Sequence, residues 1–247
     1  MILDTGAVRS LVTPGAAARL GLRRDQWAAI ALRGVGGIER RPVADLRALA
    51  VGPVALHRRS VAGDLSVAVG EMPQDAGAEG LLGADMLWSL ALDLDPRAGV
   101  LRLGPSCALS PPRSAIVVPT IQPERGWLVL AASLNGRPGR VLLDTGAARS
   151  LLTREGAFAL GPDGAPVAAG PPSVVRGVGP AASVLRPRRI GRLDVGADRV
   201  VDFVALAGSV MGPPGIDMIL GGDWIAKRRV LIDYPGRIVA FAPRTVG

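Results

Sequence analysis

Two aspartates stand in a segment that the chain contains twice. Residues 2–13 read Ile-Leu-Asp-Thr-Gly-Ala-Val-Arg-Ser-Leu-Val-Thr and residues 142–153 read Leu-Leu-Asp-Thr-Gly-Ala-Ala-Arg-Ser-Leu-Leu-Thr, so nine of twelve positions are identical. Each copy places an aspartate, Asp4 or Asp144, directly after an apolar run. A carboxylate at the end of a buried strand is costly unless it is hydrogen-bonded or shares its proton. Two such carboxyls brought face to face cannot both ionise, and one can act as base and the other as acid toward a water molecule.

The residues that follow each aspartate suit a tight loop. Gly6 and Gly146 allow the chain to turn back beneath the carboxylate. Thr5 and Thr145 supply hydroxyl groups that can bond across to the opposite loop. These glycine and threonine residues favour two equivalent loops that meet around an approximate two-fold axis.

Further repeated blocks define the organisation of the chain. Blocks of the first half recur in the same order and at similar spacing in the second, for example 33–37 at 176–180 and 82–85 at 220–223. Near-constant spacing predicts two homologous lobes. A stretch rich in proline and serine lies between them. We therefore expect a first lobe over residues 1–104, a linker over 105–115 and a second lobe over 116–247.

Most local signals are those of strands, so we expect an all-β fold. Apolar runs joined by turn residues predict hairpins over 127–143, around Asn135-Gly136, and over 230–241, around Pro235-Gly236. Residues 92–103 form the counterpart of the second hairpin. Short helical turns are expected near 15–20, 85–90 and 223–228, with Asp85 and Asp223 as caps of the last two.

The two lobes differ at their beginnings. About two dozen residues with strand character precede Asp144, whereas three precede Asp4. Either the true start lies upstream, or the first lobe lacks its leading hairpin; because unpaired strand edges are avoided, we favour the upstream start. The chain as written shows no signal peptide, which predicts a cytoplasmic protein, whereas an upstream signal peptide would predict a periplasmic or exported one.

Composition excludes several classes. The chain has 247 residues, is 49% hydrophobic and 20% charged, and carries a net charge of +8, which is incompatible with a disordered chain. One cysteine (Cys107) and one histidine (His57) exclude a disulfide framework and multi-cysteine or multi-histidine metal centres. No apolar run is long enough to span a bilayer. The arginines are scattered and not interleaved with aromatic residues, so we expect no nucleic-acid partner, although a basic binding face is a rival reading.

The doubled Asp-Thr-Gly-Ala motif, each copy followed some eighty residues later by an apolar-apolar-Gly block, resembles the pepsin/retropepsin aspartic proteases. It is most similar to the bacterial retropepsin-like aspartyl proteases in a tandem-fused form. The resemblance implies two acid-protease-type β-barrel lobes that form a pseudo-two-fold single-chain dimer with a cleft between them. It implies these roles: catalysis for Asp4 and Asp144; support of the active-site loops for Thr5, Gly6, Thr145 and Gly146; threading strands at 81–83 and 219–221; flaps that bind substrate at Gly34, Val35, Gly36, Gly37, Gly177, Val178 and Gly179.

One departure from the family bears on pH. Ala7 and Ala147 stand where pepsins carry a hydroxyl residue near the carboxylates. Without that donor the ionised form is less stabilised, so we expect a higher apparent pKa of the aspartate pair and activity nearer neutral pH.

The residues and the resemblance together predict an aspartic endopeptidase that acts on peptides or unfolded proteins. It would need no metal or organic cofactor, would prefer apolar residues around the scissile bond, and would work as a monomer because one chain carries both aspartates. The alternative is a catalytically silent peptide-binding or structural module with the same fold.

Overall fold

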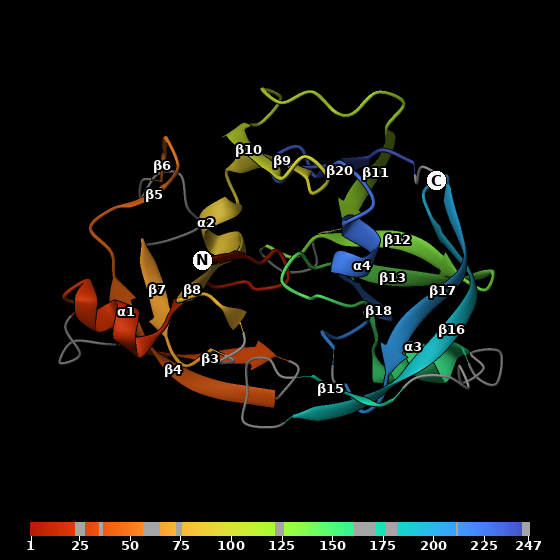
Figure 1. Cartoon of the computed structure of the whole chain (residues 1–247), viewed down its shortest axis with the longest axis horizontal. Helices are drawn as coiled ribbons and strands as arrows, with labels where there is room; N and C mark the ends of the chain where they lie inside the picture. Colours follow the sequence, from red (N-terminus) through yellow and green to blue (C-terminus); the bar gives the residue numbers. More distant parts are fainter. Residues whose placement is uncertain are drawn as a thin grey trace.

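The computed structural model describes residues 1–22, 28–34, 37–56, 65–72, 76–121, 126–160, 171–175, 182–210 and 212–243. In this part of the chain strands predominate, which confirms the all-β prediction. Figure 1 shows the first lobe on the left in red to yellow and the second on the right in green to blue. Strands of both lobes meet above them.

The first lobe is built on a six-stranded sheet in the order β1-β8-β2-β7-β4-β3. A short hairpin of two further strands, β5 and β6, stands beside it. The bounds are β1 Ile2–Leu3, β2 Leu11–Val12, β3 Ala28–Gly34, β4 Gly37–Asp45, β5 Leu49–Val51, β6 Val54–Leu56, β7 Ser66–Val69 and β8 Gly80–Leu82.

The second lobe and the strands that connect the lobes share one twelve-stranded sheet, in the order β10-β9-β19-β20-β11-β12-β13-β18-β14-β17-β16-β15. We call β10, β9, β19, β20 and β11 the inter-lobe strands. The bounds are β9 Leu90–Asp95, β10 Val100–Pro105, β11 Ile116–Ile121, β12 Val129–Leu134, β13 Arg137–Leu143, β14 Leu151–Leu152, β15 Ser173–Val175, β16 Ser183–Val195, β17 Asp198–Ala207, β18 Met218–Leu220, β19 Val230–Asp233 and β20 Ile238–Phe241.

The predicted hairpins are confirmed. β12 and β13 pair in antiparallel register around Asn135 and Gly136, whose φ angles of 52° and 82° are those that a two-residue hairpin turn requires. β19 and β20 pair around the turn that contains Pro235 and Gly236, and β9 pairs with β10 in the same way. Turn residues therefore located these hairpins correctly.

The helices are short. α1 (Pro14–Arg19) begins at Thr13, whose side chain accepts the backbone N–H of Ala16, and has proline in its first turn. α2 (Ala84–Leu87) and α4 (Gly222–Ile225) lie in the segments where helical turns were predicted. α3 (Arg154–Leu160) was not predicted, although the repeated threonine, Thr153, accepts a backbone N–H of its first turn.

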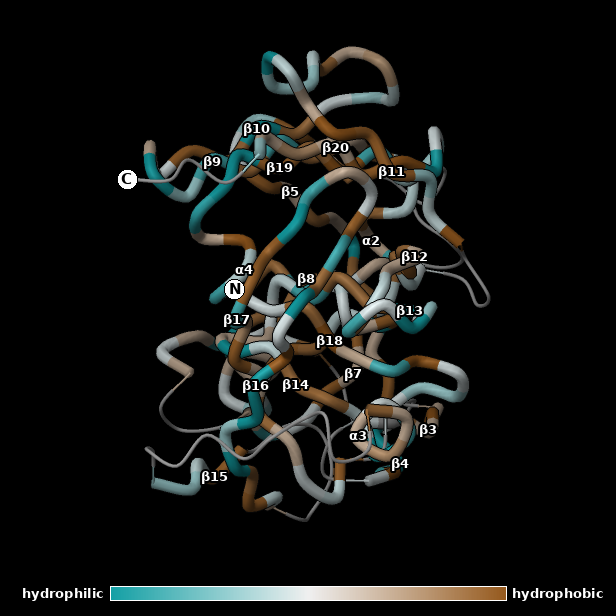
Figure 2. The backbone as a smooth tube through the Cα atoms, turned by 90° about the vertical axis from the view of Figure 1, so that its right-hand side faces the viewer, coloured by the Kyte–Doolittle hydropathy of each residue, from teal (hydrophilic) through white to brown (hydrophobic). Residues whose placement is uncertain are grey.

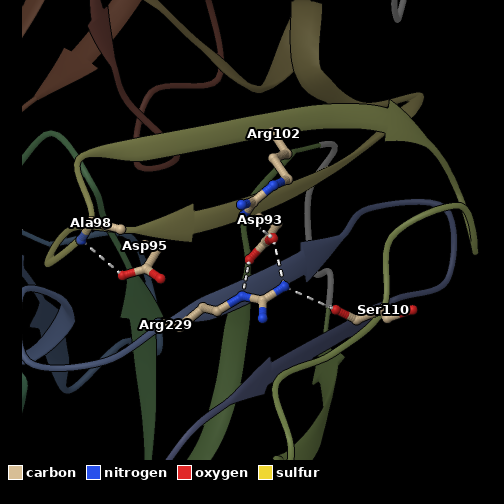
Figure 3. Close-up of polar contacts among 6 residues, drawn as sticks. All are labelled: Asp93, Asp95, Ala98, Arg102, Ser110 and Arg229. Atoms are coloured by element: carbon tan, nitrogen blue, oxygen red, sulfur yellow. Dashed lines mark hydrogen bonds and ion pairs between the residues drawn. The ribbon is translucent and has the colours of Figure 1, made fainter.

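An ion-pair cluster joins the two lobes. β9 of the first half pairs with β19 of the second, in antiparallel register. Next to this junction Asp93, only 1% exposed, accepts two hydrogen bonds of 2.7 Å from Arg229 and one of 3.0 Å from Arg102 (Figure 3). Arg229 also donates to the carbonyl of Ser110 in the predicted linker, at 3.4 Å.

Buried apolar side chains form one large core that runs through both lobes beneath the inter-lobe strands. Trp224 and Phe241, both almost fully buried, meet edge to face with ring centres 4.9 Å apart. In Figure 2 the hydrophobic colouring follows central strands such as β14 and β18. The two lobes thus share one buried core.

The lobes differ in the strand that leads to the aspartate. β13 has seven residues and lies between β12 and β18, whereas β1 has two residues and pairs with β8 alone. Within the described residues the first lobe shows no counterpart of β12. The lobe boundaries at residues 104 and 116 stay a prediction; β10 ends at Pro105 and β11 begins at Ile116. None of the helices in the described part of the chain has the length and apolarity needed to cross a membrane.

Candidate active site

Each aspartate follows a strand that lies parallel to the second apolar block of its own lobe. β1 pairs with β8, and Asp4 then donates its N–H to the carbonyl of Leu82 at 2.9 Å. β13 pairs with β18, and Asp144 donates to the carbonyl of Leu220, also at 2.9 Å. The repeated blocks therefore meet in space and fix where each Asp-Thr-Gly loop begins.

Two threonines interlock the loops. The hydroxyl of Thr5 accepts the N–H of Thr145 at 3.1 Å and donates to the carbonyl of Leu143 at 2.7 Å. The hydroxyl of Thr145 accepts the N–H of Thr5 at 3.1 Å and donates to the carbonyl of Leu3 at 2.7 Å. This reciprocal set satisfies four backbone groups and ties the two loops together around a pseudo-two-fold axis.

The glycines after the threonines bring each loop against the opposite carboxyl. A Cβ placed on Gly6 would overlap with the carboxyl group of Asp144, and one on Gly146 would overlap with that of Asp4. Glycine is needed here for space, since no side chain fits between the loops. The two carboxyls consequently lie face to face at the junction of the lobes.

Backbone N–H groups hold each carboxyl from beneath. Oδ1 of Asp4 accepts from the N–H groups of Gly6 and Ala7 at 3.0 and 2.9 Å. Oδ1 of Asp144 accepts from Gly146 and Ala147 at 2.8 and 3.1 Å. One oxygen of each carboxyl is thereby fixed, which orients the groups for chemistry on their other side.

The electrostatics of the pair are those of two carboxyls that share one proton. Burial raises the pKa of Asp4, against the lowering effect of its backbone donors. Burial and the nearby charge of Asp4 raise the pKa of Asp144 to about 7. The two carboxyls titrate as a unit, because the ionisation of one opposes the ionisation of the other. The effect expected from Ala7 and Ala147 stays a prediction, because the causes of these shifts are burial and charge.

A second pair of carboxylates supports the loops from behind. Both oxygens of Asp85 accept the N–H of Ser10 at 2.9 and 3.0 Å, and both oxygens of Asp223 accept that of Ser150 at 3.0 Å. Each serine hydroxyl also donates to its aspartate and accepts an N–H from Gly83 or Gly221. Arg9 and Arg149 lie beside them at 3.6 and 3.3 Å.

The prediction that these two aspartates cap α2 and α4 is therefore wrong. The capping positions belong to Gly83 and Gly221, which carry no side chain that could bond to the helix. Asp85 and Asp223 lie inside the first turn, and their oxygens accept hydrogen bonds from Ser10 and Ser150 of the Asp-Thr-Gly loops. The glycines themselves pass so close to the carbonyls of Ala7 and Ala147 that a Cβ would lie 2.8 and 2.7 Å from those oxygens.

Only some of the predicted flap residues lie within the described part of the chain. Gly34 and Gly37 face each other at the end of the β3–β4 hairpin. Val35, Gly36, Gly177, Val178 and Gly179 lie outside the described residues, as does His57. β15 and β16 of the second lobe pair up to Val175 and Ser183, on either side of the second predicted flap.

Each lobe also contains a small apolar cluster apart from the large core. A small cluster in the first lobe joins Leu11 and Leu32 to the partly buried Ile30, Met72 and Leu81. A cluster in the second lobe ends in the partly buried residues Trp127, Ala147 and Val175. Ala147 is the last residue of the second Asp-Thr-Gly-Ala motif, so this cluster reaches the loop that carries Asp144.

Sequence reasoning missed three polar side chains of the site: Ser10, Ser150 and Trp127. The serines are identical in both copies of the repeat, and that identity was the available signal. Trp127 was assigned only to a strand, but its indole Nε1–H donates to the carbonyl of Gly6 at 3.2 Å. Within the described residues no group of three or more His, Cys, Asp or Glu side chains is placed to hold a metal ion.

Comparison with known proteins agrees with this geometry. The sequence matches the profile of a family described as aspartyl protease over residues 1–86 and 130–224. Sequence comparison with curated proteins finds no match. The structure is similar to the crystal structure of aspartic proteinase from Irpex lacteus, with a TM-score of 0.60, 13% identity, and coverage of 98% of this chain and 89% of that one. At such low identity this likeness shows the fold, and the profile, which spans most of the chain, shows that the protein belongs to the aspartyl protease family.

Proposed function

We propose that the protein is an aspartic endopeptidase in which Asp4 and Asp144 activate one water molecule between them. The observation that supports this most directly is the face-to-face pair of carboxyls, each pressed against the glycine of the other loop, with the pKa of Asp144 raised to about 7. Two carboxyls with separated proton affinities provide a base and an acid at the same pH.

The proposed reaction follows from those two protonation states. The Asp4 carboxylate removes a proton from water while the water oxygen attacks the carbonyl carbon of the scissile peptide. The protonated Asp144 gives its proton to the carbonyl oxygen, so that a neutral tetrahedral diol forms. Asp4 then passes the proton to the amide nitrogen, the carbon–nitrogen bond breaks, and Asp144 recovers its proton from the diol as the carboxylic acid product forms.

We further propose that apolar residues are preferred next to the scissile bond. The small apolar clusters of the two lobes carry partly buried apolar side chains that a substrate could cover, namely Ile30, Met72, Leu81, Trp127, Ala147 and Val175. Burial of an apolar substrate side chain against them contributes binding energy in proportion to the area covered. An extended peptide would hydrogen-bond to the backbone of the β3–β4 hairpin in the manner of an added strand. Because both aspartates belong to one chain, a monomer suffices.

The test is digestion of an unfolded protein. The chain is incubated with reduced and alkylated serum albumin from about pH 3 to pH 8, and the new termini are identified by mass spectrometry. We expect cleavage next to apolar residues, and a fall of about 10²–10⁴-fold in Asp4→Asn and in Asp144→Asn.

Asp202→Asn is the matched control, because Asp202 is 68% exposed and pairs with the exposed Arg189. It should cleave like the unmodified chain. Cleavage that survives in both active-site variants would refute the proposal. A second outcome would be that the unmodified chain leaves the albumin intact. If Asp144→Asn then binds the unfolded albumin as tightly as the unmodified chain does, the protein is a peptide-binding module instead.

A further inference from the structure

A segment of the second lobe reaches across to the first catalytic loop. The indole of Trp127 donates to the carbonyl of Gly6 at 3.2 Å. The preceding residue, Gly126, has a φ of 103° and lies so close to Ala84 that a Cβ on it would be 2.5 Å from the Ala84 side chain. Ala84 in turn donates its N–H to the carbonyl of Ala7 at 2.8 Å. Trp127 is therefore held against the Asp4 loop by its own indole N–H and by the contact of the preceding Gly126 with Ala84.

The bond from Trp127 enters a short chain of hydrogen bonds that ends on Asp4. The carbonyl of Gly6 and the N–H of Ala7 belong to the same peptide group. The carbonyl accepts from the indole, and the N–H donates to Oδ1 of Asp4 at 2.9 Å. A donor on the oxygen of a peptide polarises that peptide and strengthens its N–H as a donor, by about 10–30% per bond. Trp127 thus acts on Asp4 through one intervening peptide.

The second loop has no such contact. The equivalent N–H, that of Ala147, donates to Oδ1 of Asp144 at the longer distance of 3.1 Å. Among the described residues no side chain donates to the carbonyl of Gly146. The two loops otherwise share the same side-chain hydrogen bonds to their aspartates and threonines.

We propose that Trp127 is a positioning residue that assigns the roles within the aspartate pair, keeping Asp4 the ionised member and leaving the shared proton on Asp144. The inference rests on the proposed function. Carboxylates are stabilised by the donors they accept, so the loop with the polarised peptide holds the charge better. The direction agrees with the pKa of Asp144, which burial and the charge of Asp4 raise to about 7.

Other titratable groups around the pair are not changed by a substitution at Trp127. The phenol of Tyr234, at the turn after β19, is 1% exposed, and burial together with the nearby carboxylates raises its pKa, so it stays neutral. Asp85, on α2, has a pKa raised by burial and is held by Ser10 and Arg9. Tyr234 and Asp85 affect the pKa values of Asp4 and Asp144 equally in the variant and in the unmodified chain, so their effect cancels in the comparison.

The test removes the indole N–H while keeping the ring. Trp127 is replaced by phenylalanine and, in a second variant of nearly unchanged volume, by 3-benzothienylalanine, which has sulfur in place of the N–H. Trp88→Phe is the control, because the ring of Trp88 meets that of Tyr234 at a tilt and lies outside this hydrogen-bond chain. Asp4 and Asp144 are titrated by NMR on carbon-13-labelled aspartate, with Asp4→Asn and Asp144→Asn used for assignment. The pH profile of kcat/KM is measured in parallel.

We expect the titration of Asp4 to move up by about 0.2–0.6 pH unit in both Trp127 variants, with a smaller change at Asp144 and none in the control. A shift of about 0.5 unit lowers kcat/KM about threefold on the acid side of the profile and leaves KM unchanged. An unmoved Asp4, or equal shifts at both aspartates, overturns the proposal.

Faster turnover with unmoved titrations overturns it too, since the indole would then only compete with substrate for the Gly6 carbonyl. The NMR titration does not depend on activity. A chain that cleaves nothing would therefore refute the proposed function while the role of Trp127 is still decided.

Discussion

Asp4 and Asp144 accept the same two backbone hydrogen bonds and meet across the same pair of threonine hydroxyls, yet they have different neighbours. The second aspartate follows a seven-residue strand with partners on both sides, and the first follows a two-residue strand at a sheet edge. A tryptophan of the second lobe is bonded to the first loop. The duplicated site thus keeps equivalent contacts at the axis where its two loops meet, and it differs in the strand before each aspartate and in the bond from Trp127 to the first loop.

The largest effect is expected where the two loops are interchangeable. Gly6→Ala and Gly146→Ala each place a methyl group in the position of the opposite carboxyl. Because the carboxyls must move apart, we expect each variant to lose at least about 100-fold in kcat/KM, and both by similar amounts. Cleavage of an apolar peptide identified in the albumin digest provides the measurement.

Gly15→Ala is the control for these substitutions, since the nearest atom to a Cβ there is 3.8 Å away and the residue lies in α1. It should retain full activity. A Gly6 variant that stays active while the Gly146 variant does not would show that the loops are not equivalent at their contact.

Sequence alone located this symmetric part well. The identical residues of the repeat include the aspartates, threonines and glycines that meet at the axis, because contacts between two copies constrain both copies in the same way. The asymmetric parts were harder to predict. Trp127 has no repeated partner, and the roles of Asp85 and Asp223 depend on a serine about 75 residues away, which local helix-capping rules do not consider. α3 was missed because its few residues gave no clear helical period.

The next largest effect concerns the unequal affinity of the two carboxyls for protons. The folded-state pKa of Asp144 is raised to about 7, so the folded chain binds this proton more tightly than the unfolded chain does. Its contribution to stability is complete below an unfolded pKa of about 4 and is lost as pH rises toward 7. Asp144→Asn removes this loss, and we expect its melting temperature to exceed that of the unmodified chain at pH 8 but not at pH 4.

Asp4→Asn should give a smaller gain at the same pH. It removes the charge that acts on Asp144 but leaves Asp144 buried, and burial is the larger cause of the raised pKa. Melting curves at several pH values separate the two variants. Equal gains would mean that the proton is shared evenly, contrary to the assignment of Asp4 as the ionised member.

A moderate effect is expected from the threonines. Thr5→Val and Thr145→Val each keep the shape of the side chain but leave one N–H and one carbonyl of the opposite loop region without a partner. We expect a loss of about 1–3 kcal/mol in the free energy of unfolding for each. Thr5 is fully buried and Thr145 is not, so the loss should be greater for Thr5→Val.

Denaturant unfolding measures this difference, and the serine variants, which keep the hydroxyl, should lose less. If the two valine variants are equally stable, the greater burial of Thr5 does not make its hydrogen bonds contribute more to stability than those of Thr145.

The smallest effect compares two aspartates that each bind two arginines. Asp93 joins the lobes and is 1% exposed, whereas Asp194, within the second lobe, is 16% exposed and bonds to Arg192 and Arg199. Burial alone would raise the pKa of Asp93, but the bonds from Arg229 and Arg102 outweigh it and hold the pKa below its ordinary value. Arg229→Met leaves a buried carboxylate with one partner and should cost about 2 kcal/mol at pH 7, while Arg199→Met should cost under about 1 kcal/mol.

The pH dependence of this difference identifies its origin. A carboxyl whose pKa is lowered by folding stabilises the chain above its unfolded pKa of about 4, and the contribution disappears as pH falls through the folded value. The cost of Arg229→Met should therefore shrink below about pH 4, because protonated Asp93 no longer needs the guanidinium. A cost that is the same at pH 3 and pH 7 would assign the role of Arg229 to its packing and to its bond with Ser110, and the ion pair would then contribute little to holding the lobes together.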